Sequence, residues 1–201
     1  TEYPVLDAFS AVPREEFVPD ALKPLAYIDE DLLVSAPGAA PRHLMEPGPL
    51  ARLVQLAQIM PTDRVLDLGS ASGYSAAILA TLAAHVTGVE PDAALAETAS
   101  ATLARLGHDN VTIIAGPLAA GHAAGAPYDV ILFEGAIELL PDVIADQLAD
   151  GGRIVAVVGS NSLAGKATIF TRSGRTVSGR PAFNTHVRPL PEFVRPKAFV
   201  F

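Results

Sequence analysis

The sequence predicts an α/β protein with a doubly wound, mostly parallel sheet, a short helical N-terminal subdomain and an antiparallel C-terminal hairpin. Between residues 50 and 159, short apolar segments alternate with helix-patterned segments, the order expected of parallel βαβ crossovers. A glycine-rich turn follows the first apolar segment. Half of the 201 residues are apolar, so the chain can bury one sizeable core.

The first predicted region is interrupted by prolines. Eight prolines fall within residues 1–49, a density that allows short helices and turns but no long element. We therefore expect a wrapped segment over residues 1–49, the alternating core over 50–160 and antiparallel strands over 161–201. The length of the chain suits a single domain made of these three parts.

The core elements follow in order. Helical apolar spacing runs through LARLVQLAQIM, residues 50–60, and DRVLDLG, residues 63–69, has the pattern of a buried parallel strand. Further helices are expected over 73–84, 92–107 and 140–150, and further strands over 85–90, 110–116, 128–135 and 151–159. Asp92 is suited to cap the helix over 92–107, and Gly107 to end it. The tail, KATIFTRSGRTVSGR and then FVRPKAFVF, predicts antiparallel strands around a Ser-Gly turn.

Composition argues against several kinds of site and partner. The formal net charge of −8 argues against a surface built for nucleic-acid phosphates or anionic lipids. The absence of cysteine excludes disulfides, thiolate-zinc sites and cysteine nucleophiles. The histidines are dispersed, so no metal site is expected. No apolar stretch has the length of a membrane span, so we expect a cytoplasmic protein, either a monomer or a weak dimer.

A glycine-rich turn lies between the first predicted strand and the next helix, in VLDLGSASGYSAA. Gly69 and Gly73 allow close approach of the backbone to a ligand, and N–H groups at a helix start attract negative charge. Glu90 ends the next predicted strand about twenty residues later, where an acid can accept hydrogen bonds from two ribose hydroxyls. Since ligands bind at this carboxyl edge of an open sheet, the combination predicts a nucleoside-binding site.

The glycine spacing distinguishes two kinds of nucleoside cofactor. A dinucleotide fingerprint requires glycine at 69, 71 and 74, where the chain has Gly69, Ala71 and Tyr74. The shorter G-x-G-x-G turn of S-adenosylmethionine enzymes requires glycine at 69, 71 and 73, so only Ala71 departs from it. S-adenosylmethionine is therefore favoured over NAD or FAD. We expect Ala71 to be tolerated if its φ is negative, and Asp67 either to orient the amino group of the cofactor through water or to cap the turn.

Six stretches of the chain resemble the protein-L-isoaspartate O-methyltransferase family, over nearly the whole length. They are VPREEFVPDALKPLAYIDEDLLV, DRVLDLGSASGYSAAILA, VTGVEPD, LARLGHDNVTIIAG, APYDVILFEGAIELLP and LADGGRIVAVVG. The first and the last are distinctive of that family, because many methyltransferases share only the glycine turn. The resemblance implies a Rossmann-like methyltransferase fold, with residues 1–49 as a cap on the substrate side and 50–160 as the cofactor-binding core.

The resemblance also implies an activity: methyl transfer from S-adenosylmethionine to a carboxylate of a protein or peptide that carries isoaspartyl residues. An ionised carboxylate is already a nucleophile at pH 7, so such an enzyme mainly has to align it with the sulfonium methyl group and exclude water. The predicted cofactor residues are Asp67, Gly69, Ser70, Ala71, Gly73, Glu90, Pro91, Gly116, Pro117 and Leu118.

Two loops depart from the pattern of that family. Its Thr-Ile-Ser-Gln-Pro-like loop carries a hydroxyl that positions the acceptor, but this chain has HLMEP, residues 43–47. Met45 cannot donate a hydrogen bond, and Glu46 is negative where an anionic acceptor is expected, unless it is protonated or turned away. The family also has a Gly-Asp-Gly-like turn with an acid for the adenine amino group, and here the turn is Gly-Pro-Leu, residues 116–118.

Alternatives remain open for both loops that face the acceptor. His43, Met45 and Glu46 form the predicted catalytic set, yet Pro47 disfavours helical geometry for Glu46, whose carboxylate can instead stabilise the start of the next helix. Residues Glu134, Gly135 and Glu138 form either a substrate-side loop or a solvated one. For the whole chain, the alternatives are a methyltransferase with another small acceptor, a non-catalytic descendant that binds a nucleoside or a protein partner, and an NAD-linked reductase.

Overall fold

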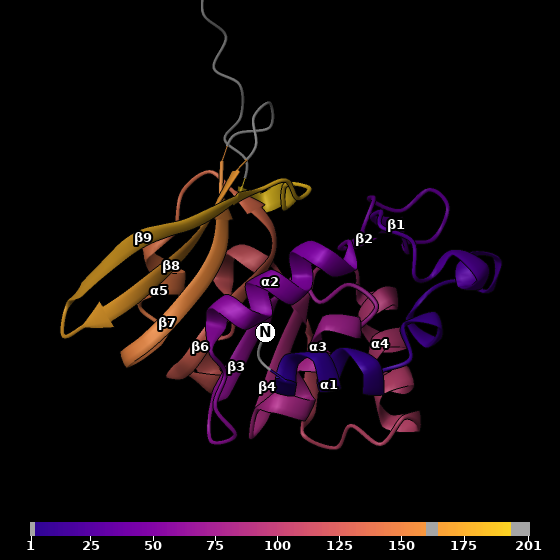
Figure 1. The fold of residues 1–201 in the computed structure, drawn as a ribbon, viewed down its shortest axis with the longest axis horizontal. Coiled ribbons are helices and arrows are strands. Elements are labelled where there is room, and N and C mark those ends of the chain that lie inside the picture. The colour runs from indigo at the N-terminus through magenta and orange to yellow at the C-terminus, as the bar shows by residue number, and fades with distance from the viewer. Residues whose placement is uncertain (1–2, 160–164, 194–201) are drawn as a thin grey trace, which may run out of the picture.

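The computed structural model describes residues 3–159 and 165–193. A seven-stranded sheet with the order β5-β4-β3-β6-β7-β8-β9 forms its centre (Figure 1). The strands are β3 Arg64–Leu68, β4 His85–Glu90, β5 Val111–Ala115, β6 Tyr128–Ile137, β7 Leu148–Val158, β8 Gly165–Ser173 and β9 Thr176–Thr185. Neighbours from β5 to β7 pair in parallel, and β7, β8 and β9 pair antiparallel. The predicted α/β sheet with its antiparallel C-terminal hairpin is confirmed.

Helices cover both faces of the sheet. They are α1 Tyr3–Ala11, α2 Pro47–Ala57, α3 Tyr74–Leu82, α4 Ala93–Arg105 and α5 Asp142–Ala145, and Figure 1 shows α1 and α2 in front of the sheet with α5 behind it. Alternate strand residues point to opposite faces, so Val65 and Val130 join the core under α1 to α4, whereas Leu66 and Ile131 join the core beside α5. Burial on both faces explains why these strands are continuous apolar runs.

The N-terminal region consists of short elements that pack against the start of α3. After α1 come 3-10 helices at Arg14–Phe17 and Asp20–Leu25, then a small antiparallel pair of β1 Leu32–Leu33 with β2 His43–Leu44. The Phe17 ring lies 5.7 Å from that of Tyr74, and the Ser72 hydroxyl donates a 2.6 Å hydrogen bond to the Phe17 carbonyl. These contacts fix the N-terminal segment beside the glycine-rich turn.

The predicted helix over 140–150 is wrong in its extent. The helix α5 spans only Asp142–Ala145, and β7 already begins at Leu148, which pairs with Tyr128. The Gln147 side chain accepts from the His122 amide and donates to the carbonyl groups of Ala120 and Val143. The helix therefore stops after about one turn, because these tertiary contacts hold the following residues in the sheet.

Other predicted element ends are confirmed. The Asp92 carboxylate accepts from the amides of Ala94 and Leu95 and caps α4, and Gly107 just beyond that helix has φ +79. The β8–β9 hairpin turns at Gly174 and Arg175, directly after Ser173, which pairs with Thr176. In the last predicted strand, FVRPKAFVF, Phe193 ends a 3-10 helix that begins at Pro191, and residues 194–201 lie outside the described residues.

Gly73, the residue before α3, gives a test of this packing. Its φ is +95, and a Cβ there would lie 3.2 Å from side-chain atoms of Ala99 and Leu103 in α4. Gly73→Ala is therefore expected to lower the free energy of unfolding by about 2–4 kcal/mol, from backbone strain plus overpacking. Gly107→Ala is the matched control, because its φ is +79 but no atom lies within 4 Å of the added methyl group. Urea denaturation measures both, and equal losses would contradict tight packing at Gly73.

Candidate active site

A small chamber lies where the glycine-rich turn meets the loop after β2. Its volume is about 10 Å³, and its lining includes His43, Met45, Ser70, Ala71 and Glu134. That volume holds about one water molecule. The structure therefore brings predicted acceptor-side and predicted cofactor residues together around one small space. Glu46, Pro91 and Glu138 are among the predicted residues that do not line it.

The strongest interaction at this edge is a buried ion pair that involves a residue absent from the predicted site. Arg42 donates from Nε to Glu90 Oε1 and from Nη2 to Glu90 Oε2, both at 2.9 Å. Arg42 is 5% exposed and Glu90 is 0% exposed. The same Nη2 atom also donates to the Gly69 carbonyl at 3.1 Å. The two planar groups thus meet in the bidentate geometry that favours arginine over lysine.

Backbone groups use the remaining capacity of the Glu90 carboxylate. The Ala71 amide donates to Oε2 at 2.8 Å, and the Asp92 amide donates to Oε1 at 3.2 Å. Each oxygen therefore accepts two hydrogen bonds, which is about the number that a carboxylate oxygen can take. No acceptor position on Glu90 is left for another ligand while Arg42 is bound to it.

Ala71 adopts a conformation different from the one expected. Its φ is +48, so the negative φ under which we expected Ala71 to be tolerated is not the one that it adopts. A left-handed conformation costs a residue with a Cβ about 1–2 kcal/mol. The turn imposes this conformation, because it aims the Ala71 amide at Glu90. The glycine that the G-x-G-x-G turn requires at this position would adopt the same φ without strain.

Two carboxyl groups, Asp67 and Glu134, meet beside the chamber. Asp67 is fully buried, and Glu134 Oε1 is buried although the residue as a whole keeps some exposure. Burial raises the pKa of Asp67 to about 7, and burial followed by the neighbouring Asp67 charge raises the pKa of Glu134 well above its usual value. Two buried carboxylates that act on each other repel when both are ionised, which favours a proton on one of them. The pair therefore retains a proton at neutral pH.

The pair has other neighbours that matter for the site. Asp67 Oδ2 accepts from the Ser75 hydroxyl at 2.8 Å, so this oxygen is used within the protein. Asp67 Oδ1, Glu134 Oε1 and the Ser70 hydroxyl are buried and receive no hydrogen bond from an N–H or O–H group of the described residues. Buried polar atoms of this kind are uncommon and often mark a functional site. The cofactor role expected of Asp67 stays a prediction.

The loop after β2 is fixed by its backbone. The carbonyl of Met45, which is 6% exposed, accepts a 2.8 Å hydrogen bond from Nη2 of the fully buried Arg14. Glu46 lies at the N-cap of α2 with φ −46 and ψ 136, so the non-helical geometry expected before Pro47 is confirmed, and its carboxylate makes no capping hydrogen bond. Burial, and then the Arg188 charge, lower the pKa of His43. The described hydrogen bonds and ion pairs join no His43 atom to Glu46, so their catalytic pairing stays a prediction.

The C-terminal segment over residues 187–193 also reaches this edge, which the sequence did not indicate. Its backbone runs beside β6, where the Ala136 amide donates to Arg188 and the Leu190 amide donates to Ala136. The Leu190 side chain packs against Gly69, since a Cβ added to Gly69 would lie 2.9 Å from Leu190 Cδ2. Gly135 permits this crossing, because a Cβ there would lie 2.7 Å from the Arg188 carbonyl oxygen.

The turn after β5, predicted to contact adenine, has a partner from the same segment. Glu192 accepts from the amides of Leu118 and Ala119 at 3.1 and 3.0 Å. Leu118 is fully buried, and the Gly116 amide donates to the Glu90 carbonyl at 3.0 Å. The turn is therefore packed inward, and its amides at 118 and 119 are already used.

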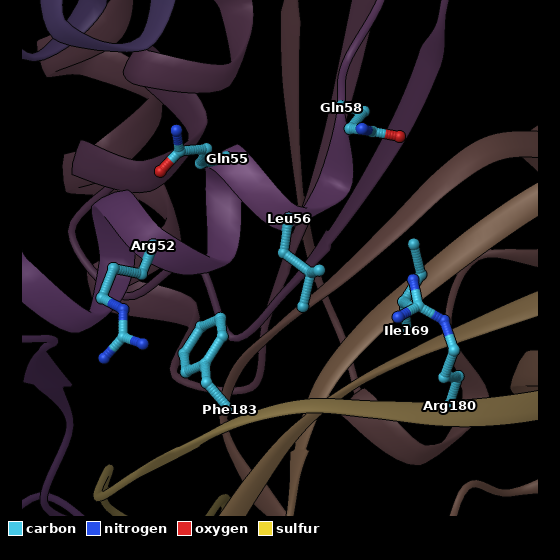
Figure 2. Close-up of a pocket in the computed structure, with 7 residues that line it drawn as sticks. All are labelled: Arg52, Gln55, Leu56, Gln58, Ile169, Arg180 and Phe183. Carbon is cyan, nitrogen blue, oxygen red and sulfur yellow. The ribbon is translucent and has the colours of Figure 1, made fainter. Parts of the chain in front are cut away.

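A larger cavity of about 390 Å³ lies between α2 and the β8–β9 hairpin (Figure 2). It is lined by Arg52, Gln55, Leu56, Gln58, Ile169, Arg180 and Phe183. The Arg52 guanidinium lies 3.7 Å from the centre of the Phe183 ring. This cavity contains none of the predicted site residues.

Residues 3–159 and 165–193 contain neither a helix suited to span a membrane nor a cluster of side chains suited to hold a metal ion. Within these ranges no helix combines the length and apolar character needed to cross a bilayer. The same residues contain no group of three or more histidine, aspartate or glutamate side chains placed to hold a metal ion.

The parallel sheet, the glycine-rich turn after β3 and the acid at the end of β4 define a Rossmann-like methyltransferase. The chain belongs to the protein-L-isoaspartate(D-aspartate) O-methyltransferase family, whose sequence model matches residues 1–187. A protein-L-isoaspartate O-methyltransferase of Koribacter versatilis is 40% identical over 171 residues, which are 85% of this chain and 75% of that protein. One of Protochlamydia amoebophila is 41% identical over 155 residues, 77% of this chain and 72% of that protein.

Solved structures agree with the family. A protein-L-isoaspartate O-methyltransferase superimposes with a TM-score of 0.83 at 25% identity, over 94% of this chain and 61% of that one. A putative family member from Plasmodium falciparum, solved with S-adenosyl-L-homocysteine, superimposes with a TM-score of 0.76 over 95% of this chain and 91% of that one. That second match is 19% identical and supports the fold. The predicted family and Rossmann-like methyltransferase fold are confirmed.

The shared proton of Asp67 and Glu134 predicts a pH dependence of stability. Unfolded carboxyl groups lose their protons near pH 4, whereas the folded pair keeps at least one up to about pH 7. The folded state therefore binds more protons across this window, and the free energy of unfolding contributed by the pair falls as the pH rises, by about 1.4 kcal/mol per pH unit for each proton. Glutamine cannot titrate, so Glu134→Gln is expected to have a shallower dependence.

Urea denaturation of the wild type and of Glu134→Gln between pH 4.5 and 8 measures this dependence. Glu138→Gln is the matched control, since it removes an acid just beyond β6 that does not line the chamber. Identical slopes for the wild type and Glu134→Gln would contradict a proton held by the pair.

Proposed function

We propose that this chain is an S-adenosylmethionine-dependent O-methyltransferase that methylates the carboxylate of isoaspartyl residues in proteins or peptides. The observation that carries the proposal is the match of the family over residues 1–187, together with Glu90 buried at the carboxyl end of β4. Its curated relatives bear the name of that activity. S-adenosylmethionine would supply a methyl group on a sulfonium centre.

The residue types at the edge fit such a donor. Glu90 is placed for ribose hydroxyls, Gly69 and Gly73 have φ near +95, and the buried hydroxyl of Ser70 has no hydrogen-bond partner among the described residues. The space between these residues, however, is small. The chamber holds about one water molecule, whereas small-molecule sites usually measure about 300–1,000 Å³. Donor binding therefore requires Arg42 to leave Glu90.

On the acceptor side, we assign Glu134 a positioning role. Met45 stands where the family has a hydroxyl, and its buried side chain gives the chamber an apolar wall that excludes water. A protonated Glu134 is neutral, so it does not repel an anionic acceptor, and it can donate a hydrogen bond to the carboxylate. Glu134 would thus supply the donor that Met45 lacks. His43 belongs to the catalytic set in this proposal, and Gly135 and Glu138 belong to the substrate-side loop around the same acceptor.

The proposal also covers the domain organisation, the class of substrate, the location and the oligomeric state. The three segments 1–49, 50–160 and 161–201 act as one domain in this proposal. A net charge of −8 favours a protein or peptide substrate, or another small acceptor, over nucleic acid or an anionic membrane. We place the protein in the cytoplasm as a monomer or weak dimer.

A second candidate function is a non-catalytic relative that binds a protein partner. The observation that favours it is the full engagement of both Glu90 oxygens by Arg42 and two backbone amides. Robust methyl transfer by the purified chain would exclude this candidate.

Methyl transfer to a synthetic isoaspartyl peptide tests the leading proposal. The wild type is expected to transfer labelled methyl groups to the isoaspartyl peptide and not to the same peptide with aspartate. Glu134→Ala is expected to lower kcat/KM by about tenfold or more, because a hydrogen-bond donor to the acceptor is lost. Glu134→Gln keeps an N–H donor and is expected to retain most of the activity.

Two results would contradict these expectations separately. If the chain binds S-adenosyl-L-homocysteine but methylates no isoaspartyl peptide, the repair activity is rejected. If Glu134→Gln and Glu134→Ala lose activity equally, the hydrogen-bond donor role of Glu134 is rejected while the repair activity stands.

A further inference from the structure

Groups of the chain itself contact three parts of the predicted donor site. Arg42 holds Glu90, the acid placed for ribose. The Leu190 side chain packs against Gly69 in the glycine-rich turn. Glu192 accepts hydrogen bonds from the Leu118 and Ala119 amides in the turn after β5, where adenine is expected. These three contacts come from two segments far apart in the sequence, residues 34–42 and 187–193.

The Arg42 contact is the one that a ribose must replace directly. Two hydroxyls of a ribose would donate hydrogen bonds to the two Glu90 oxygens, and the Arg42 Nε and Nη2 groups already donate one to each. Both kinds of donor need the same lone pairs, because the Ala71 and Asp92 amides occupy the others. Simultaneous binding of Arg42 and ribose to Glu90 is therefore excluded by the hydrogen-bonding capacity of a carboxylate.

Burial and backbone hydrogen bonds hold Arg42 in the position from which it binds Glu90. Arg42 is 5% exposed, and its backbone is fixed by a 2.9 Å hydrogen bond from the Val34 amide to its carbonyl and by a 3.1 Å bond from its own amide to the Ser35 hydroxyl. Its Nη2 also binds the Gly69 carbonyl. The arginine thus bridges the glycine-rich turn and the end of β4, the two parts between which a donor would lie.

We propose that Arg42 is an internal competitor for the donor site, whose guanidinium holds Glu90 in place of the ribose hydroxyls and sets the affinity of the chain for its donor. The inference rests on the proposed function. Arg42 directly precedes the loop that carries His43 and Met45, so release of its guanidinium removes the link between that loop and Glu90. Donor binding and the arrangement of the acceptor loop are coupled in this way.

Calorimetric titration with S-adenosyl-L-homocysteine tests the competition without any need for turnover. Arg42→Met removes the guanidinium and keeps much of the apolar stem, so it is expected to bind the ligand at least tenfold more tightly than the wild type. Arg42→Lys keeps the charge but loses the two-armed geometry, and its affinity is expected to fall between the two. Glu192→Ala frees the amides at 118 and 119, and it is expected to raise the affinity for S-adenosyl-L-homocysteine by less than Arg42→Met does.

The matched control is Arg153→Met. Arg153 also pairs with a largely buried carboxylate, since its Nη2 lies 2.6 Å from Asp63 Oδ2, and Asp63 precedes β3 at the opposite, amino end of the parallel strands. Its loss is expected to lower the melting temperature but to leave the affinity for S-adenosyl-L-homocysteine within twofold of the wild type.

The possible outcomes separate the inference from the proposed function. A measurable affinity that is equal in the wild type and in Arg42→Met overturns the competition and leaves the proposed methyltransferase standing. If Arg42→Met does not fold, equal affinities for Arg42→Lys and the wild type overturn it in the same way. An absence of binding to the wild type, Arg42→Lys and Arg42→Met at millimolar ligand rejects donor binding itself, and the proposed function falls with it.

Discussion

The ion pair between Arg42 and Glu90 is the interaction on which the rest of this edge depends. It joins residues 48 positions apart in the sequence and ties together the segment before β2, the turn after β3 and the end of β4. Removing one partner of a buried pair usually costs about 3–5 kcal/mol, because the other charge is left without compensation. The pair therefore fixes the closed shape of the site, and any ligand that takes Glu90 must also give Arg42 a new environment.

Charge balance explains how so many ionisable groups can be buried around one small chamber. Arg14 and Arg42 carry two positive charges, while Glu90 carries one negative charge and the Asp67–Glu134 pair, which shares a proton, carries another. The sum is close to zero, as burial in a medium of low polarity requires. A fully ionised Asp67–Glu134 pair would add one negative charge, and it would also bring two like charges into contact. The retained proton is thus a consequence of the closed arrangement and of the two neighbouring arginines.

Local sequence patterns predicted the core strands and most of the helices, but not the extent of the helix expected over 140–150. The strand over 85–90 and the Asp92 cap follow from apolar runs and from turn chemistry, which act over a few residues. The Asp67–Glu134 contact, in contrast, depends on the pairing of β3 with β6, in which Leu68 lies opposite Phe133. Arg42 and the 187–193 segment were missed for the same reason, since only the folded chain brings them to Glu90 and Gly69. The only signal for Arg42 in the sequence was its place as an arginine with no acidic neighbour, directly before the unusual loop over residues 43–47.

Arg42 binds the two Glu90 oxygens that the ribose of a donor needs. The most direct measurement is the nitrogen-15 NMR signal of the Arg42 Nε–H group during addition of S-adenosyl-L-homocysteine. We expect a slowly exchanging, hydrogen-bonded Nε–H in the free protein, which shifts and becomes exchangeable with solvent as the ligand saturates the site. A protected and unshifted Arg42 signal in the saturated complex would show that the ligand binds without displacing Arg42, and would contradict the account.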